Sequence, residues 1–282
     1  MRRAGTGKAA SHAVLILGAL VVAFPFFWML STSLKTGAEA DHSPPTLLPA
    51  SPQFSNYAEA WHSAAKTTAG HVTFTTYFGN SVTVAACVTA GVLLTSILAG
   101  YAFANMRFRG KDLVFVLFLS TMMIPFEVVL VPNFRTMVAL GWYDTYLALT
   151  VPWMANVFSI FILRQFFRSI PGDYFDAAQI DGCGHWRYMW QVAVPMAAPA
   201  LVTITIFTFL GSWNALMWPM LVTDSAEMRV VQVGLSILQG EESTRFQVLM
   251  AASALVIIPV VVLYLFLQRR FVEGVSHTGI KA

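Results

Sequence analysis

Long apolar stretches separated by short polar segments form the dominant pattern along the chain. A helix needs about 20 apolar residues to cross about 30 Å of hydrocarbon. By that measure the pattern predicts an all-α integral membrane protein with six transmembrane helices. They are expected at His12–Leu34, Tyr77–Ala104, Leu113–Pro132, Tyr146–Leu163, Met196–Val222 and Gln247–Leu267.

The first apolar stretch follows Arg2, Arg3 and Lys8, as the apolar part of a signal peptide would. It is too long for such a segment and lacks a cleavage site with small residues, so we expect an uncleaved helix. The N-terminal residues 1–11 and the first transmembrane helix at 12–34 then precede an extracytoplasmic loop at 35–76. The transmembrane core is expected at 77–268, and a tail at 269–282.

Within the 35–76 loop, four prolines predict an irregular first half, at Pro44, Pro45, Pro49 and Pro52. The segment Asn56–Ala65 predicts a short helix capped by Asn56, with Tyr57 and Trp61 on one side.

Composition supports a membrane protein. Hydrophobic residues make up 57% of the chain and charged residues 11%, against roughly a quarter charged in soluble domains. The pI is near 9.0, but the basic residues lie in small groups beside apolar segments, which excludes a nucleic-acid-binding stripe. Cys87 lies in an apolar segment and Cys183 in a polar loop, so neither a disulfide nor a metal site is expected.

The distribution of lysine and arginine predicts the orientation. With the N-terminus inside, the inside segments hold 12 of the 17 Lys and Arg residues, which places both termini and the 164–195 segment in the cytoplasm. The twelve are Arg2, Arg3, Lys8, Arg107, Arg109, Lys111, Arg164, Arg168, Arg187, Arg269, Arg270 and Lys281.

The polar loop at 171–195 contains two predicted short helices. The first covers Tyr174–Ile180 and ends at the turn Asp181-Gly182; the second covers His185–Val192, before Pro195. Ala177 and Ala178 are small enough for a partner to approach the helix backbone, and Asp176 offers an acceptor to basic groups. For the second half, an interfacial helix with Trp186, Tyr188 and Trp190 among lipid headgroups is an equal alternative.

The spacing in this loop resembles the Glu-Ala-Ala loop of ABC importer permeases. Asp176-Ala177-Ala178, Gly182 and Val192-Ala193-Val194-Pro195 match it in order and separation, with Asp176 where the family usually has Glu. The resemblance runs from Met29 to the C-terminus and is greatest to the carbohydrate branch of maltose type. Other matching segments are Ser31–Lys35, Asn80-Ser81, Tyr101–Ala104, Arg107–Lys111, Trp213-Asn214 and Gln268–Gly274.

The resemblance implies a type I importer permease with a five-helix core and a peripheral first helix. It implies that the loop docks on a separate ATPase subunit through Asp176, Ala177, Ala178, Asp181, Gly182 and Pro195. It also implies a second permease subunit, two ATPase subunits that bind the ATP and Mg²⁺, an external solute-binding protein, and a location in the bacterial inner membrane. The expected substrate is a sugar or oligosaccharide, with glycerol phosphates or polyols as the alternative.

Polar and aromatic residues within the spans are candidates for the substrate pathway. Trp213, Asn214 and Trp218 would line a path by stacking on sugar rings, with helix packing as the alternative. Glu127 would serve the pathway or lie at the membrane interface, because a charge at the bilayer centre costs at least ~2.5–3.5 kcal/mol. Asn80, Asn105 and Asn156 would serve the pathway or hydrogen-bond between helices.

Two other function classes are weaker. An ATPase-independent secondary transporter would need intramembrane pairs of ionisable residues, and Glu127 alone supports it poorly. A membrane-embedded enzyme would need a nucleophile and a base, and the sequence has neither Gly-x-Ser-x-Gly nor His-Glu-x-x-His. We therefore expect a non-catalytic transport subunit.

Overall fold

The computed structural model describes residues 3–62, 66–67, 70–241 and 245–278. These residues form two compact units. One unit consists of the residues up to Thr75 together with Gly234–Ile258, and the other of Thr76–Val233 together with the residues from Pro259 onward. Predictions that concern Arg2, residues 63–65 and residues 279–282 lie outside the described part of the chain.

The first unit contains three N-terminal helices and a small hairpin. They are α1 (Arg3–Ser33), α2 (Gly37–Ala40), α3 (Ser55–His62), β1 (Lys66–Thr67) and β2 (Gly70–His71). The unit also takes in most of α14 (Val231–Glu241) and the start of α15 (Phe246–Thr278). Ser11–Ser33 of α1 is apolar and long enough to cross a membrane, and its side chains are mostly exposed in the single chain except at the end, where Ser31, Thr32 and Ser33 are buried.

The segment after α1 is tied back to the end of that helix. Asn56 does not cap α3 as predicted; it lies inside the helix, buried, and its amide donates to the Ser33 and Lys35 carbonyls at 2.9 and 2.8 Å. The prediction was wrong because a tertiary contact uses the side chain that a local cap would have used. Lys35 is itself buried, with its Nζ 4.5 Å from the Trp28 ring centroid.

A local capping box fixes α2. The Thr36 side chain accepts from the Glu39 amide, and the Glu39 carboxylate accepts from the Thr36 amide. The other carboxylate oxygen accepts from the Ala50 amide at 2.9 Å. These backbone hydrogen bonds hold the pKa of Glu39 below its ordinary value.

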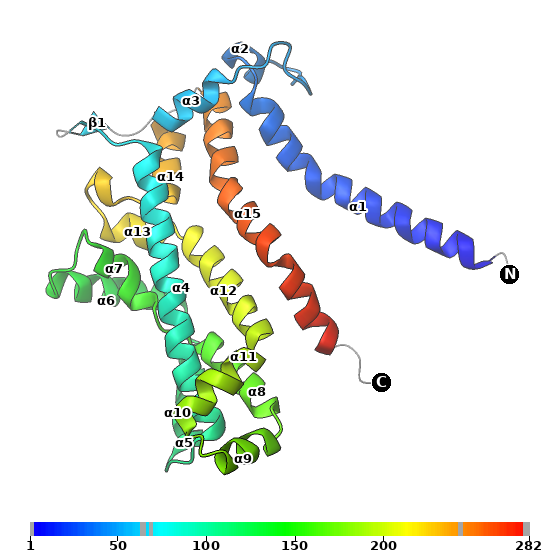
Figure 1. The fold of residues 1–282 in the computed structure, drawn as a ribbon. Coiled ribbons are helices and arrows are strands. Elements are labelled where there is room, and N and C mark those ends of the chain that lie inside the picture. Colours follow the sequence, from blue (N-terminus) through cyan, green and yellow to red (C-terminus); the bar gives the residue numbers. More distant parts are fainter. Residues whose placement is uncertain (1–2, 63–65, 68–69, 242–244, 279–282) are drawn as a thin grey trace. The chain divides into compact units, whose positions relative to one another are not determined.

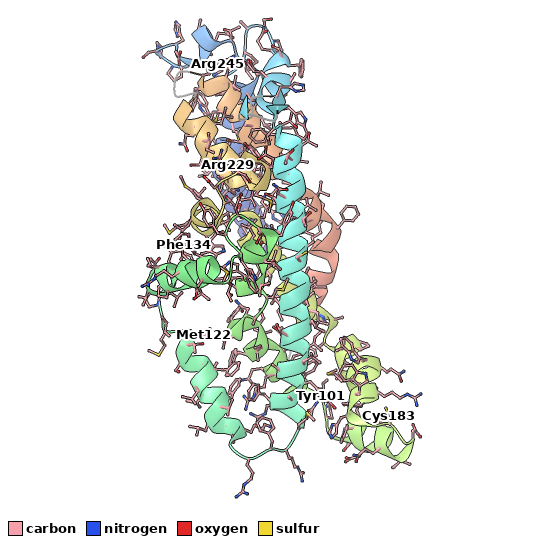
Figure 2. All side chains as sticks on the ribbon, turned by 90° about the vertical axis from the view of Figure 1, so that its left-hand side faces the viewer. Tyr101, Met122, Phe134, Cys183, Arg229 and Arg245 are labelled. Atoms are coloured by element: carbon pink, nitrogen blue, oxygen red, sulfur yellow. The ribbon has the colours of Figure 1, made fainter. Side chains whose placement is uncertain are left out.

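The second unit is built around α4 (Phe74–Asn105), most of which belongs to it (Figure 1). The elements that follow are α5 (Lys111–Thr121), α6 (Phe126–Ala139), α7 (Tyr146–Thr150), η1 (Val151–Trp153), α8 (Val157–Ser169), α9 (Asp173–Ile180), α10 (His185–Tyr188), η2 (Met189–Ala193), α11 (Val194–Met196), α12 (Ala198–Trp213), α13 (Met217–Val222) and η3 (Ala226–Met228). In both views α5, α9 and α10 lie at the same end of α4 (Figures 1 and 2).

Two predicted spans are bent, and a third bend lies between the polar loop and the start of the predicted span Met196–Val222. Among the described residues, three helices are long enough to span alone, and the count reaches six if each of three bent pairs is one span. The bends measure 97° between α5 and α6, 41° before α8, and 77° before α12. Met122 marks the first bend in Figure 2.

Prolines explain where these spans break. Pro125 precedes α6, Pro152 lies in η1, and Pro199 lies in the first turn of α12. Proline lacks a backbone donor and disfavours helix in the residue before it. The predicted span Met196–Val222 also ends early, since α12 stops at Trp213 and α13 starts at Met217.

Close packing fixes α8 against α4. A Cβ atom at Gly100 would lie 3.0 Å from the Leu163 Cβ and 3.2 Å from the Arg164 backbone nitrogen. A Cβ at Gly91 would overlap the Met154 side chain. Small residues allow such backbone approach between membrane helices, so α4 packs closely against α8 and against Met154, which precedes α8.

Candidate functional sites

The polar loop at 171–195 folds into two helical segments, as predicted. The second runs past the predicted Val192, through α10, the π-helical η2 and α11, and ends at Met196. The first, α9, begins as the Tyr174 amide donates to the Pro171 carbonyl at 3.2 Å. It ends as Gly182 and Cys183 donate to the Gln179 and Ala178 carbonyls at 3.0 and 2.9 Å. Gly182 has φ +74°, the left-handed conformation that glycine adopts without strain. The predicted turn at Asp181-Gly182 is therefore confirmed.

The side chains predicted to meet a partner are mostly exposed within the described part of the chain. Asp176 and Ala177 are exposed, and Ala178 is half-buried. Among the described residues, the carboxylates of Asp176 and Asp181 form no hydrogen bond or ion pair. Pro195 is exposed as well, within α11. The arrangement leaves two acceptors and a small-residue helix face available, and their role stays a prediction.

A cluster of aromatic side chains joins α9 to the transmembrane helices. The Phe175 ring stacks on His185 at 4.8 Å between centroids and meets Tyr188 edge-on at 4.9 Å. His185 Nδ1 hydrogen-bonds to the Tyr101 hydroxyl at 3.0 Å. Tyr101, near the end of α4, also packs edge-on against Phe167 of α8 at 6.0 Å. These side-chain contacts therefore connect α9 to both α4 and α8.

The same cluster shows how the side chains of the second half of the loop are distributed. Tyr188 is buried within the chain, with 2% of its surface exposed. Trp186 is 67% exposed, and its ring meets Trp190 at 5.9 Å. The second helix is thus anchored in protein through Tyr188, with Trp186 directed outward. The sequence contained Phe175 and Tyr101 but gave no sign that both pack against His185 and Tyr188. Figure 2 labels Tyr101 and Cys183 at this end of the unit.

A cavity of about 460 Å³ lies among the transmembrane helices of the second unit. Aromatic rings form much of its wall: Trp153 meets Trp218 edge-on at 5.4 Å and Phe126 at 5.6 Å. Asn156, Ser159, Thr208 and Ser212 supply neutral polar groups, and none of the described lining residues carries a charge. Such a wall can stack on a ring and hydrogen-bond to hydroxyls.

Of the three predicted pathway residues Trp213, Asn214 and Trp218, one lines this cavity. Trp218 lines the cavity, and its Nε1 donates to the Ala148 carbonyl at 2.9 Å. Trp213 and Asn214 do not line it. Trp213 is buried against Phe209, and the Asn214 Oδ1 accepts from Gln232 at 3.3 Å.

Asn80 and Glu127 also lie outside the cavity. The Asn80 amide donates to the Glu227 and Arg229 carbonyls at 2.7 and 2.9 Å and accepts from the Tyr146 hydroxyl at 2.6 Å. These contacts hold the connection after α13 against α4. Glu127 is exposed, and its carboxylate has no hydrogen bond or ion pair within the described residues.

Sequence reasoning missed several residues of the cavity wall. Phe126 and Trp153 were absent from the predicted pathway, although each lies within two residues of a helix-breaking proline. Asn156 was a candidate and does line the cavity, where its Oδ1 also accepts from the Ser159 amide at 2.9 Å. The sequence signal that could have indicated these two residues is an aromatic residue beside a proline within an apolar stretch.

Comparison with known proteins gives consistent matches. The family described as binding-protein-dependent transport system inner membrane component matches residues 91–277. The sn-glycerol-3-phosphate transport system permease protein UgpE of Brucella abortus (strain 2308) is 33% identical over 269 residues, which cover 95% of each chain. The UgpE protein of Yersinia pestis bv. Antiqua (strain Antiqua) is 34% identical over 269 residues, 93% of this chain and 94% of that one.

A solved structure agrees with the sequence relatives. A chain of a bacterial ABC transporter involved in the import of the acidic polysaccharide alginate superposes with a TM-score of 0.81 and 26% identity. The match covers 96% of this chain and 99% of that chain. A chain of the bacterial alginate ABC transporter in complex with an alginate pentasaccharide-bound periplasmic protein has a TM-score of 0.60 at 13% identity, and shares the fold.

Proposed function

The chain belongs to the family of binding-protein-dependent transport system inner membrane components, and from this premise we propose that it carries a sugar or oligosaccharide through the membrane. It is a non-catalytic, multi-pass permease subunit of an ABC importer. ATP hydrolysis in this family resides in separate ATPase subunits. Beyond family membership, we propose a route of coupling, a substrate class, the partners and the orientation in the membrane.

The observation that carries the coupling proposal is the anchored α9 helix. Its outer face is free, and its inner side is fixed to α4 and α8 through Phe175, His185 and Tyr101. Two ATPase subunits that close on ATP would move α9, and the rings would pass that movement to the transmembrane helices. Inverting a 1:99 ratio of conformations requires about 5.5 kcal/mol, which a flexible loop could not transmit.

The proposed transport cycle requires several partner proteins. A second homologous permease subunit would complete the translocation path, two ATPase subunits would each bind ATP and Mg²⁺, and an external solute-binding protein would deliver the substrate. Relative rocking of the two permease subunits would then switch access from outside to inside.

The experiment that tests this function is reconstitution in liposomes. We expect ATP-dependent uptake only when both permease subunits, the ATPase and the solute-binding protein are present. The purified chain alone should show no ATP turnover in detergent. Robust hydrolysis by the chain alone, or ATP-independent uptake, would contradict the proposal.

The uncharged cavity supports a neutral sugar as the substrate. The relatives above are named for sn-glycerol-3-phosphate or for alginate, which are anions. An anion would be poorly stabilised among Trp153, Trp218 and neutral polar groups, since burying a charge without a partner is costly. In uptake competition we expect neutral sugars to compete, polyols weakly, and glycerol phosphates least. Preferential competition by a glycerol phosphate would overturn this part of the proposal.

The orientation is tested with the natural cysteines. Both are free, and Cys183 lies in the turn after α9, whereas Cys87 lies within α4. A membrane-impermeant maleimide should label Cys183 in inside-out vesicles and spare it in right-side-out vesicles. Cys183→Ser is the control for labelling elsewhere. The opposite pattern would place the 171–195 loop outside the cell.

A further inference from the structure

A second cavity, of about 530 Å³, lies where the α4–α5 connection and the start of α5 meet the end of α8. Its lining includes four cationic residues and one acidic residue: Arg107, Lys111, Arg164, Arg168 and Asp112. We propose that this cavity binds the phosphate headgroup of an anionic phospholipid. The proposal does not depend on the transported substrate or on α9 docking.

Two of the cations are held in place by the protein itself. Arg164 is 7% exposed, its Nε donates to the Phe103 carbonyl at 3.3 Å, and its guanidinium lies 3.9 Å from the Phe115 ring centroid. Lys111 donates to the Ala104 and Met106 carbonyls at 3.2 and 3.0 Å. Positioned cations of this kind bind an anion without the entropy cost of ordering long side chains.

The cationic charge of the cavity is poorly balanced within the protein. The Arg164 Nη2 is 3.8 Å from the Asp112 carboxylate, longer than a hydrogen bond, and the Asp112 side chain is 90% exposed. Within the described residues, Arg107 and Arg168 form no hydrogen bond or ion pair. Four cations therefore face one solvated carboxylate, and an anion would supply the missing charge.

The N-terminus of α5 adds donors of a different kind. Gly110 precedes the helix with φ +79° and has no side chain that could cap it, so it supplies no acceptor to the first amides of α5. Gly110, Lys111 and Leu113 line the cavity. Uncapped amides at a helix N-terminus bind phosphate groups and carry partial positive charge. Side chains and backbone thus converge on one anion site.

Apolar side chains beside the cations favour a lipid over a free anion. Leu113 is 66% exposed, Phe108 44% and Met106 41%, and all three line the cavity. Inorganic phosphate would leave them in water, whereas the glycerol backbone and acyl chains of a lipid would cover them. Basic pockets at the ends of transmembrane helices bind anionic headgroups in this manner.

Binding would brace a mechanically important part of the chain. Arg168 lies in the last turn of α8, directly before the 171–195 loop. Arg107 belongs to the connection between α4 and α5. A headgroup held by both would fix the end of α8 to that connection at the membrane surface, next to the segment that leads into α9.

The test measures lipid binding to the full-length chain in the complex with which it purifies. Native mass spectrometry would follow dioctanoyl phosphatidylglycerol, with dioctanoyl phosphatidylcholine and inorganic phosphate as comparison probes. The variant Arg107→Gln/Arg168→Gln removes two exposed cavity cations. Arg109→Gln/Arg187→Gln removes the same charge from residues that do not line the cavity. We expect the first variant to weaken phosphatidylglycerol binding by about tenfold or more and the second by less than about twofold.

Each outcome decides a separate part of the proposal. Equal losses in the two double variants would mean diffuse surface attraction and would overturn the site. If inorganic phosphate displaces phosphatidylglycerol at a similar concentration, the cavity is a site for a free anion, and the proposal that it binds a lipid is wrong. Asp112→Asn removes the competing carboxylate and should strengthen binding, an outcome that damage to the fold would not produce. Unchanged or weaker binding in Asp112→Asn would contradict the charge argument.

Discussion

The α9 surface and the membrane cavity are built in opposite ways. Asp176, Ala177 and Ala178 are consecutive, their shape is set locally by the turn at Gly182, and the two carboxylates of the surface are uncommitted. The cavity wall comes from residues between Val84 and Pro219, and Trp218 within it already has a hydrogen-bond partner in the chain. If the proposed roles hold, changes on α9 are expected to affect association while sparing the fold, whereas changes in the cavity are expected to affect uptake and packing together.

Ala178→Arg should have the largest effect. A long charged side chain would enter a closely packed interface with the ATPase, and an unpaired buried charge costs about 3–5 kcal/mol. Association should weaken by orders of magnitude. We expect normal amounts of the variant in the membrane, no co-purifying ATPase and no uptake. Ala178→Ser keeps the side chain small and should retain both the ATPase and uptake. Loss of the ATPase in Ala178→Ser, or its retention in Ala178→Arg, would show that α9 is not the contact surface.

Gly182→Val should have the next largest effect. Valine in the left-handed conformation costs about 1–2 kcal/mol, and relief of that strain would reorient α9. We expect poor assembly, or ATP hydrolysis that no longer drives uptake. Gly184→Val is the matched control, because Gly184 has φ −77° and a Cβ atom at either glycine meets nothing within 4 Å. Equal defects in both variants would show that bulk, and not backbone conformation, is responsible.

Trp218→Phe should reduce uptake by about tenfold, as expected when a buried hydrogen bond is lost and an acceptor is left unsatisfied. The Ala148 carbonyl would lose its donor, and the ring facing Trp153 would shrink. Trp213→Phe is the control, since Trp213 is as deeply buried but lies outside the cavity. We expect Trp218→Phe to raise the KM for uptake and Trp213→Phe to lower only the amount of folded protein. The same KM change in both would remove the cavity from the substrate path.

Glu127→Gln should have the smallest effect. The carboxylate is exposed and belongs to neither region, so uptake should stay within about twofold of the parent. Uptake measured at several pH values checks this. A complete loss of uptake, together with loss of its pH dependence, would point to coupling by protons and not by ATP.

Sequence alone predicted α9 well because all its determinants are local. Residues 173–182 contain the helix, its end and the glycine turn, and these depend on residues close together in the sequence. The aromatic anchoring was not predictable, because Phe175, Tyr188 and Tyr101 come together only through the fold.

The apolar pattern of the transmembrane spans does not predict where a helix is continuous and where it breaks. Pro25 and Pro259 lie inside continuous helices, while Pro125 and Pro152 lie at breaks. The same residue type gives both outcomes, because the effect of a proline depends on its structural surroundings and not on the apolar pattern alone. The prediction that Asn56 caps α3 was wrong for a similar reason, because the Asn56 side chain hydrogen-bonds to the Ser33 carbonyl.

The central claim, that α9 is the contact with the ATPase, is tested most directly by photo-crosslinking. In a Cys87→Ser/Cys183→Ser background, Ala177→Cys and Arg109→Cys would each carry a maleimide benzophenone in the assembled complex. The account predicts that the ATPase subunit is captured from Ala177→Cys and far less from Arg109→Cys, which lies in the α4–α5 connection. Capture of the ATPase equally from both positions, or from neither, would contradict it.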